Sequence, residues 1–196
     1  MCGRYYITEE TKTELEKLVH DLERKINGAK LMGDIVPSAK APILLADKKE
    51  ISATMGRWGF PATQSKSLII NARAETVRDK TMFANCLDSG RCVIPVAGFY
   101  EWDKSKNKFT FTGKQDDILY LAGIYRQRDE EEQFVILTTQ ANASMERVHH
   151  RMPLILDKVQ MQDWLMCEEQ MDTLLRAVPK ELDGSTEMEQ MRLDFI

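Results

Sequence analysis

The residues with the greatest chemical potential stand at the start of the chain, in the segment MCGR. A small residue at position 2 usually permits removal of Met1, which would leave Cys2 as the N-terminal residue. Cys2 would then carry an α-amine and a thiol on adjacent carbons, with ordinary pKa values of roughly 7.7–8.0 and about 8.5. Both groups would be partly nucleophilic near neutral pH. The alternative is that Cys2 is a small apolar residue packed in the first strand.

A second segment, NARAET at 71–76, directly follows the apolar residues LII. At the end of a strand, Asn71, Arg73 and Glu75 would occupy alternate positions and point toward one face. Such a face could orient a nucleophile and bind an anion. The alternatives are that Asn71 completes a turn and that Arg73 and Glu75 form a surface ion pair.

Two later segments supply acid–base groups. GFYEW at 98–102 places Glu101 among aromatic residues, where a carboxylate can act as a proton carrier near neutral pH. VHHRMP at 148–153 contains His149, His150 and Arg151 before a proline that ends any helix. Each residue could instead be an ordinary structural one. Their occurrence together with Cys2 favours a site with a nucleophile, an orienting group and acid–base groups.

Composition limits the protein class. With 196 residues, 43% of them hydrophobic and 30% charged, the chain is expected to form one globular domain over 1–196. Its formal charge of −4 argues against an indiscriminate polyanion binder. Arg and Lys recur between 57 and 80, however, while 129–132 is wholly acidic, so a local basic cleft remains compatible with the sequence.

Several classes are disfavoured by missing patterns. Four cysteines and three histidines show no paired metal-ligand spacing, so we expect free thiols, no metal site and no cofactor. Glycine-rich phosphate loops are absent, which argues against a nucleotide cofactor. We find no secretory signal and no apolar run of membrane-spanning length, and therefore expect a cytoplasmic protein without a membrane partner.

The elements that must position these residues follow from the hydrophobic pattern. An amphipathic helix is predicted over 8–27, with Thr8 as its cap, Gly28 after its end, and one apolar face: Leu15, Leu18, Val19, Leu22 and Ile26. Further helices are predicted near 76–86, 141–147 and 159–177. Strands are predicted at 42–46, 51–55, 68–70, 91–100, 108–112, 117–125 and 133–139. This order indicates an α+β fold in which mainly antiparallel sheets curl, like a barrel, around a core.

MCGR, NARAET, GFYEW and H-x-RMP, in this order, resemble the SOS response-associated peptidase (SRAP) family, which includes abasic-site shielding proteins. The resemblance covers residues 2 to about 165. It implies the SRAP fold, with a cleft for single-stranded DNA, in a protein of the DNA damage response. It also implies that Met1 is removed by a thiol-peptidase-like self-processing step, and that Cys2 reacts with the aldehyde of an abasic site. Neither a cofactor nor a second subunit is implied, so we expect a monomer.

Roles for individual residues follow from the same resemblance. Cys2 would be the nucleophile, Asn71 would orient its amine, Glu101 would carry protons, and His149 would assist ring opening and reversal, which is lyase-like chemistry. The DNA contacts would come from four residues: Arg4, Arg73, Thr138 and Arg151. Between Trp58 and Asn71, relatives often carry additional aromatics that this chain lacks. Base stacking, worth ~1–3 kcal/mol per base, is therefore expected to be weaker at that segment.

The predicted chemistry explains the need for an N-terminal cysteine. An amine and an aldehyde alone form an imine that water reverses, whereas a thiol on the adjacent carbon closes a five-membered thiazolidine. Two alternatives stay open at this point. One is an N-terminal-nucleophile amidohydrolase, since glutamine amidotransferases also begin with Cys-Gly. The other is a non-catalytic module that binds single-stranded DNA, with Cys2 in a packing role.

Overall fold

The structure is a computed structural model that describes residues 2–20, 22–26, 32–63 and 65–186. One of its two main sheets has five strands in the order β15-β10-β9-β1-β2, and all neighbours are antiparallel. We call it the first sheet. Its strands are β1 (Arg4–Ile7), β2 (Gly33–Ile35), β9 (Gly98–Trp102), β10 (Lys108–Thr112) and β15 (Asp183–Thr186).

The second main sheet closes on itself. Five of its strands form a ring in the order β12-β4-β3-β8-β11, because β11 also pairs with β12. The ring strands are β3 (Lys40–Asp47), β4 (Glu50–Trp58), β8 (Arg91–Val96), β11 (Leu119–Arg128) and β12 (Glu131–Gln140). Only β12 and β4 pair in parallel within this ring. The predicted α+β fold with curled, mainly antiparallel, barrel-like sheets is therefore confirmed.

Short strands extend this ring. β7 (Asn71–Arg73) pairs in parallel with β12, and β13 (Arg151–Pro153) pairs antiparallel with the same strand. β14 (Ile155–Leu156) pairs with β11, while β5 (Phe60–Pro61) and β6 (Leu68–Ile69) form a separate pair. Because β7 and β13 both join the second half of β12, they bring the 71–76 and 148–153 segments together.

Alternate side chains of the ring strands fill two separate cores. Leu44, Val93 and Val135 pack in one cluster with residues of the helices. Ile43 and Ile94 occupy the other cluster, with Tyr5, Phe99 and Phe111 of the first sheet. Fully burying a large apolar side chain stabilises a fold by about 1.5–3 kcal/mol, so both clusters contribute substantially. Cys2 belongs to the second cluster, between the ring and the first sheet.

The predicted strand over 91–100 divides at Ala97. β8 stays in the ring, whereas β9 pairs with β1 in the first sheet. The N–H of Ala97 donates to the carbonyl of Tyr6 at 3.0 Å, which holds the crossing point against β1. This division matters for function because β9 carries Glu101 into the neighbourhood of Cys2.

The predicted helix over 8–27 is wrong in its length. It divides into α1 (Glu9–Leu18) and α2 (Leu22–Lys25), because Val19 adopts an extended conformation. Thr8 is the cap residue, as predicted, and its N–H donates to the Thr11 hydroxyl at 3.4 Å. The predicted face nevertheless packs in the helix-side cluster, with Leu18 partly buried. The predicted end at Gly28 lies outside the described residues.

The other helix predictions also need correction. The 76–86 helix is found as a 3₁₀ turn, η1 (Ala74–Thr76), followed by α3 (Thr81–Ser89). The 159–177 helix divides at the extended Cys167 into α4 (Lys158–Met166) and α5 (Met171–Leu174). Residues 141–147 form turns instead of a helix, and the Asn142 side chain donates to the carbonyl oxygens of Pro179 and Lys180. A further 3₁₀ turn, η2 (Lys114–Asp116), precedes β11.

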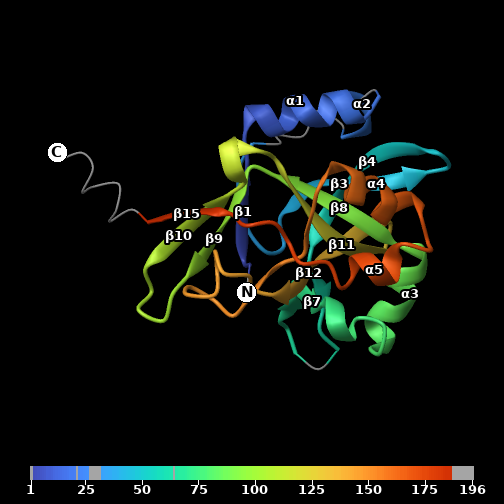
Figure 1. Ribbon diagram of the computed structural model, residues 1–196. Helices are drawn as coiled ribbons and strands as arrows, with labels where there is room; N and C mark the ends of the chain where they lie inside the picture. The colour runs from blue at the N-terminus through green and yellow to red at the C-terminus, as the bar shows by residue number, and fades with distance from the viewer. Residues whose placement is uncertain (1, 21, 27–31, 64, 187–196) are drawn as a thin grey trace.

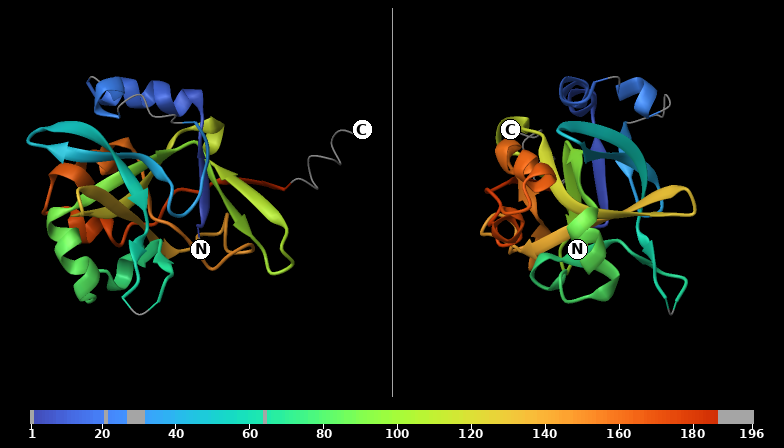
Figure 2. Two further views of the ribbon diagram at one scale, coloured as in Figure 1. Left: turned by 180° about the vertical axis from the view of Figure 1, so that it is seen from behind. Right: turned by 90° about the vertical axis from the view of Figure 1, so that its right-hand side faces the viewer.

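Figures 1 and 2 show that α1 and α2 lie along one side of the ring, and that α3, α4 and α5 cover another. The β9–β10 hairpin and β15 extend away from the ring on the side opposite these three helices. The start of β1 lies near the 141–150 loop in Figure 1 and in the left view of Figure 2. No helix within the described ranges is long and apolar enough to cross a bilayer.

Candidate functional site

Cys2 lies two residues before the start of β1 and is completely buried in the core beside the first sheet. Its Sγ atom lies 3.9 Å from the carbonyl oxygen of Arg4. Burial, followed by the negative charge of Glu101, raises the pKa of the Cys2 thiol to about 12. The thiol of Cys2 is therefore protonated at neutral pH, whereas the sequence alone suggested a partly ionised group.

Asn71 is the residue that binds the backbone of Cys2. Its Nδ2 donates to the carbonyl oxygen of Cys2 at 2.9 Å, across 69 positions of sequence. Its Oδ1 atom is buried and has no hydrogen-bond partner among the residues that the structure describes. A buried amide oxygen without a donor is uncommon, so this atom is suited to accept a hydrogen bond from a ligand or from an amine.

Glu101 faces the core from β9, between two residues that face outward. Its side chain is buried, whereas Tyr100 is half-buried and Trp102 is exposed. Oε1 of Glu101 accepts a hydrogen bond from the N–H of Trp102 at 3.3 Å. The effect of Glu101 on the pKa of Cys2 shows that its carboxylate is electrostatically coupled to the thiol. The structure thus places a buried carboxyl group close enough to the Cys2 thiol to raise its pKa.

His149 lies in the loop before β13. The backbone N–H of Arg151 donates to its Nδ1 atom at 2.9 Å, and the carbonyl oxygen of Arg151 lies 3.1 Å from the same atom. The backbone of Arg151 thus holds Nδ1 of His149, and Nε2 is the ring nitrogen that faces away from this backbone. The His149 ring stacks on that of exposed His150, with centroids 4.4 Å apart. Electrostatic repulsion between the two rings in their protonated forms is the main cause that lowers the pKa of His150.

Arg151 and Thr138 lie together on the neighbouring strands β13 and β12. Arg151 is nearly buried, and its guanidinium makes two contacts of 2.7 and 2.8 Å with the carboxylate of Glu75. It also donates to the carbonyl oxygen of Thr138 at 2.5 Å and lies 3.3 Å from the hydroxyl. Arg151 was predicted to contact a phosphate. In the structure, both of its terminal guanidinium nitrogens already bind protein groups.

Arg73 and Arg4 are more accessible. Arg73 is exposed, and Arg4 is 41% exposed in its side chain. Asp34 lies 3.7 Å from Arg4, and the guanidinium carbon of Arg4 lies 5.9 Å from the centre of the Trp102 ring. Cationic groups at solvent-exposed positions beside an exposed indole are the combination that binds single-stranded nucleic acids.

Two features of this region were not found from the sequence. One is the Glu75–Arg151 pair, since the alternative considered for Glu75 was a pair with Arg73. The other is the outer face of the first sheet, where the Tyr6 and Tyr100 rings stack at 5.2 Å beside Trp102. The alternation in GFYEW could have revealed this face, because a buried Glu101 requires Tyr100 and Trp102 to point the other way.

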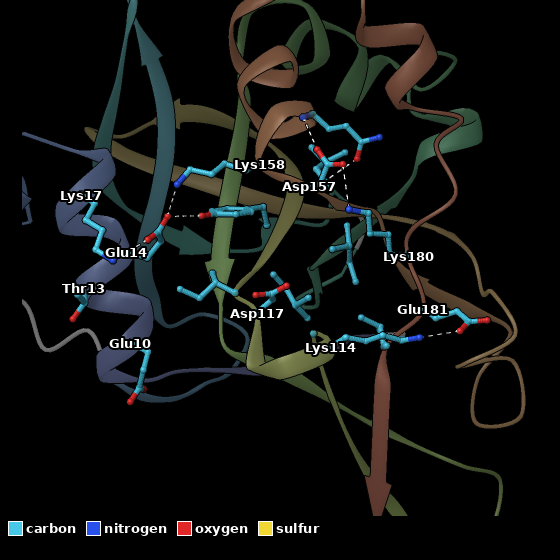
Figure 3. A pocket seen from close by; sticks show the side chains of 18 of the residues that line it. Glu10, Thr13, Glu14, Lys17, Lys114, Asp117, Asp157, Lys158, Lys180 and Glu181 are labelled. Atoms are coloured by element: carbon cyan, nitrogen blue, oxygen red, sulfur yellow. Dashed lines mark hydrogen bonds and ion pairs between the residues drawn. The ribbon is translucent and has the colours of Figure 1, made fainter.

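One surface hollow lies next to this site, and another lies away from it. One of about 600 Å³ adjoins Glu75 and extends over Arg78, Thr139, Gln140 and Arg176. Another, of about 780 Å³, lies under α1 and contains none of the predicted site residues (Figure 3). Its charged rim is paired internally, for example Glu14 with Lys158 at 2.7 Å. Among the described residues, no cluster of His, Cys, Asp or Glu could hold a metal ion.

The fold has close counterparts among solved structures. A protein from Bacteroides thetaiotaomicron matches 94% of this chain and 91% of its own length, with a TM-score of 0.77 and 22% identity. A phage-related protein from Bordetella bronchiseptica matches 94% of this chain and 93% of its own, with a TM-score of 0.75 and 23% identity. At these identities the likeness defines the class of fold: a closed strand ring joined to a second sheet.

The sequence comparison is more specific. Residues 1–193 match the family described as SOS response associated peptidase (SRAP), and the chain belongs to this family. It is 30% identical over 179 residues to the abasic site processing protein YoqW of Bacillus subtilis, covering 84% of this chain and 80% of that one. It is 28% identical to the abasic site processing protein YedK of Escherichia coli, covering 86% and 81%. The resemblance read from the four motifs is thereby confirmed.

Proposed function

We propose that this protein processes abasic sites in single-stranded DNA by forming a covalent adduct through Cys2 once Met1 has been removed. The supporting observation is the convergence of Asn71 from β7 and Glu101 from β9 on the residue that would become the N-terminus. The relatives named as abasic site processing proteins support the substrate class. The proposed substrate group is the open-chain aldehyde of the damaged sugar.

The high pKa of the Cys2 thiol sets the order of the proposed steps. The α-amine adds to the aldehyde first, and loss of water gives an imine. The S–H of Cys2 then adds across the C=N bond: sulfur bonds to carbon, and its proton is delivered to nitrogen. Glu101 accepts and returns this proton, so the thiolate exists only while the ring closes. The product is a thiazolidine that joins the protein to the DNA.

Asn71 and His149 have separate tasks in this scheme. The buried Oδ1 of Asn71 accepts a hydrogen bond from the new α-amine and directs its lone pair toward the aldehyde. His149 moves a proton at the sugar ring oxygen through Nε2, which assists ring opening and the reverse reaction. Removal of Met1 would use the same Cys2 and Glu101 in one self-directed peptide hydrolysis, as a thiol peptidase does.

The proposed DNA path uses the accessible cations. Arg4 and Arg73 contact phosphates on either side of the damaged nucleotide, and Trp102 offers a face to a base. Thr138 is completely buried against Arg151, so its proposed contact with DNA requires that the Arg151 side chain move. Arg151 can join them only by sharing its guanidinium with Glu75. This arrangement requires one chain, so the active unit is proposed to be a monomer acting on DNA in the cytoplasm.

The test is denaturing gel electrophoresis of processed protein incubated with a single-stranded oligonucleotide that contains one abasic site. We expect a heat-stable adduct, and far less with intact duplex. Cys2→Ala, if Met1 is still removed, keeps the amine and lacks the thiol, so its adduct should survive only after borohydride reduction. A tag fused before Cys2 blocks the amine and should abolish both adducts.

Two outcomes would contradict the proposal. If the blocked protein crosslinks as well as the processed one, the nucleophile lies elsewhere in the chain. If processed wild type binds the oligonucleotide without any covalent product, the protein is a binding module in which Cys2 has a packing role. Intact-protein mass spectrometry before and after incubation distinguishes these cases and reports whether Met1 is present.

A further inference from the structure

The ion pair between Glu75 and Arg151 lies directly beside the proposed acid–base residue His149. Glu75 belongs to the η1 turn after β7, and Arg151 is the first residue of β13. Both carboxylate oxygens of Glu75 are used, at 2.7 and 2.8 Å from two guanidinium nitrogens. Such two-point pairs fix the direction of the guanidinium as well as its position.

The same arginine controls the ring of His149 through its backbone. Arg151 pairs with Gln140 in the β12–β13 register, and its N–H donates to Nδ1 of His149 at 2.9 Å. Its side chain is held at the opposite end by Glu75 and by the carbonyl oxygen of Thr138. One residue thus links the η1 turn to the tautomer and orientation of His149.

We infer that Glu75 is a positioning residue: it anchors Arg151 so that the Arg151 N–H presents Nε2 of His149 to the substrate, and it restrains Arg151 from binding phosphate. This inference rests on the proposed function, because His149 needs a fixed tautomer only if it transfers a proton. Arg151 is nearly buried, so loss of the carboxylate would leave a cation without its partner. The side chain would then turn toward solvent or DNA, and the start of β13 would loosen.

Glu75→Gln should therefore change the affinity for DNA and the crosslinking rate in opposite directions. Non-covalent affinity for undamaged single-stranded DNA should rise roughly twofold to fivefold, because a carboxylate beside Arg73 and Arg151 is lost and a guanidinium is released. The single-turnover crosslinking rate at saturating protein should fall roughly tenfold to a hundredfold, because a displaced acid–base group is poorly oriented. A residue with a merely structural role would weaken both.

Glu131→Gln is the matched control. Glu131 also makes a two-point contact with an arginine, Arg57, at 2.6 and 2.9 Å, but it begins β12 at the end away from the site. Its loss should change neither DNA affinity nor crosslinking rate. Thermal unfolding of both variants reports any general loss of structure.

The direct readout is the ring ¹⁵N spectrum of His149 in the protein without DNA. The chain has three histidines, and His150→Gln assists assignment. Wild type and Glu131→Gln should show a single tautomer, whereas Glu75→Gln should show a mixture of tautomers. Arg151→Lys, which retains the charge but cannot form the two-point pair, should resemble Glu75→Gln. If both variants keep the wild-type tautomer and rate, Glu75 is not a positioning residue.

The two proposals fail in different ways. A wild-type protein that forms no adduct with abasic DNA overturns the proposed function, whatever the spectrum of His149. An adduct that forms normally in Glu75→Gln, with unchanged affinity and tautomer, overturns only the inference about Glu75.

Discussion

The thiol of Cys2 has a pKa of about 12 because it is fully buried and lies near the carboxylate of Glu101. In a model peptide the thiol of a cysteine has a pKa of about 8.5. The environment therefore disfavours a standing thiolate, which supports the proposed order in which the α-amine reacts first. A protected thiol is also less open to oxidation, which follows the amount of exposed thiolate.

Charge at single residues should govern the strength of DNA binding. We expect Arg73→Ala and Arg4→Ala to lower the affinity for single-stranded DNA, and each lost phosphate contact to reduce the salt slope by about 0.7. Asp34→Asn should act in the opposite direction, because Asp34 lies 3.7 Å from Arg4 and opposes its attraction to phosphate. Fluorescence anisotropy titrations at several salt concentrations measure both quantities.

Arg128→Ala provides the control for these variants. Arg128 forms an exposed pair with Asp129 at the hairpin between β11 and β12, at the far end of β12 from Thr138. Its removal should leave the salt slope unchanged. Slopes that stay at the wild-type value in both Arg73→Ala and Arg4→Ala would show that these residues form surface pairs instead of DNA contacts.

At the scale of elements, the site depends on how the chain leaves the ring after β8 and enters the first sheet as β9. Gly98 occupies the first position of β9, and a Cβ atom there would lie 2.6 Å from the carbonyl oxygen of Phe111 and 2.7 Å from the Tyr6 hydroxyl. The Phe111 oxygen belongs to the backbone of β10, which cannot turn aside as a side chain can. Close approach of three strands at this point therefore requires glycine.

Gly98→Ala should consequently lower the free energy of unfolding by about 1–3 kcal/mol, as overpacking does. It should also slow crosslinking, since a shifted β9 displaces Glu101. Gly184→Ala is the matched control: it lies in the same sheet, but its Cβ would meet only the Phe111 ring, at 2.9 Å. Urea unfolding of both variants tests this, and an equal loss in the two would contradict the role given to the backbone contact.

At the scale of the whole molecule, carboxylate pairs join segments that are distant in sequence. Arg57 and Lys40 lower the pKa of Glu131 to about 2, Lys158 lowers that of Glu14, and Arg151 lowers that of Glu75. These pairs connect β12 with β4 and β3, α1 with α4, and η1 with β13. Because the pKa values of these carboxyl groups differ between the folded and the unfolded chain, the free energy of unfolding depends on pH.

The sign of this coupling follows from the direction of the pKa changes. A carboxylate with a depressed pKa stabilises the folded state above its unfolded pKa of about 4.3, and this stabilisation is lost as the pH falls through the folded value. We expect the free energy of unfolding to decrease steadily between about pH 5 and 2. Urea unfolding across this range measures it. Glu131→Gln should flatten the decrease, and an unchanged profile in that variant would contradict the assignment.

The local pattern of residue types in the sequence was sufficient to predict much of the fold. Runs rich in β-branched and aromatic residues, bounded by turn residues, predicted β3, β4, β10, β11 and β12 close to their observed bounds. Helix ends were predicted less well. Val19 and Cys167 adopt extended conformations that interrupt the helical stretches, and no local signal marks either position.

The sequence by itself determined the family and the candidate residues, because Cys2, NARAET, GFYEW and H-x-RMP have distinctive types and spacing that are independent of folding. Only the tertiary structure decided which residues meet. It placed Asn71 on the Cys2 carbonyl, paired Arg151 with Glu75 instead of leaving it accessible, and raised the pKa of the Cys2 thiol. The physical reason is that burial, desolvation and hydrogen bonds between positions 69 or 76 residues apart arise from long-range packing, which a linear pattern does not contain.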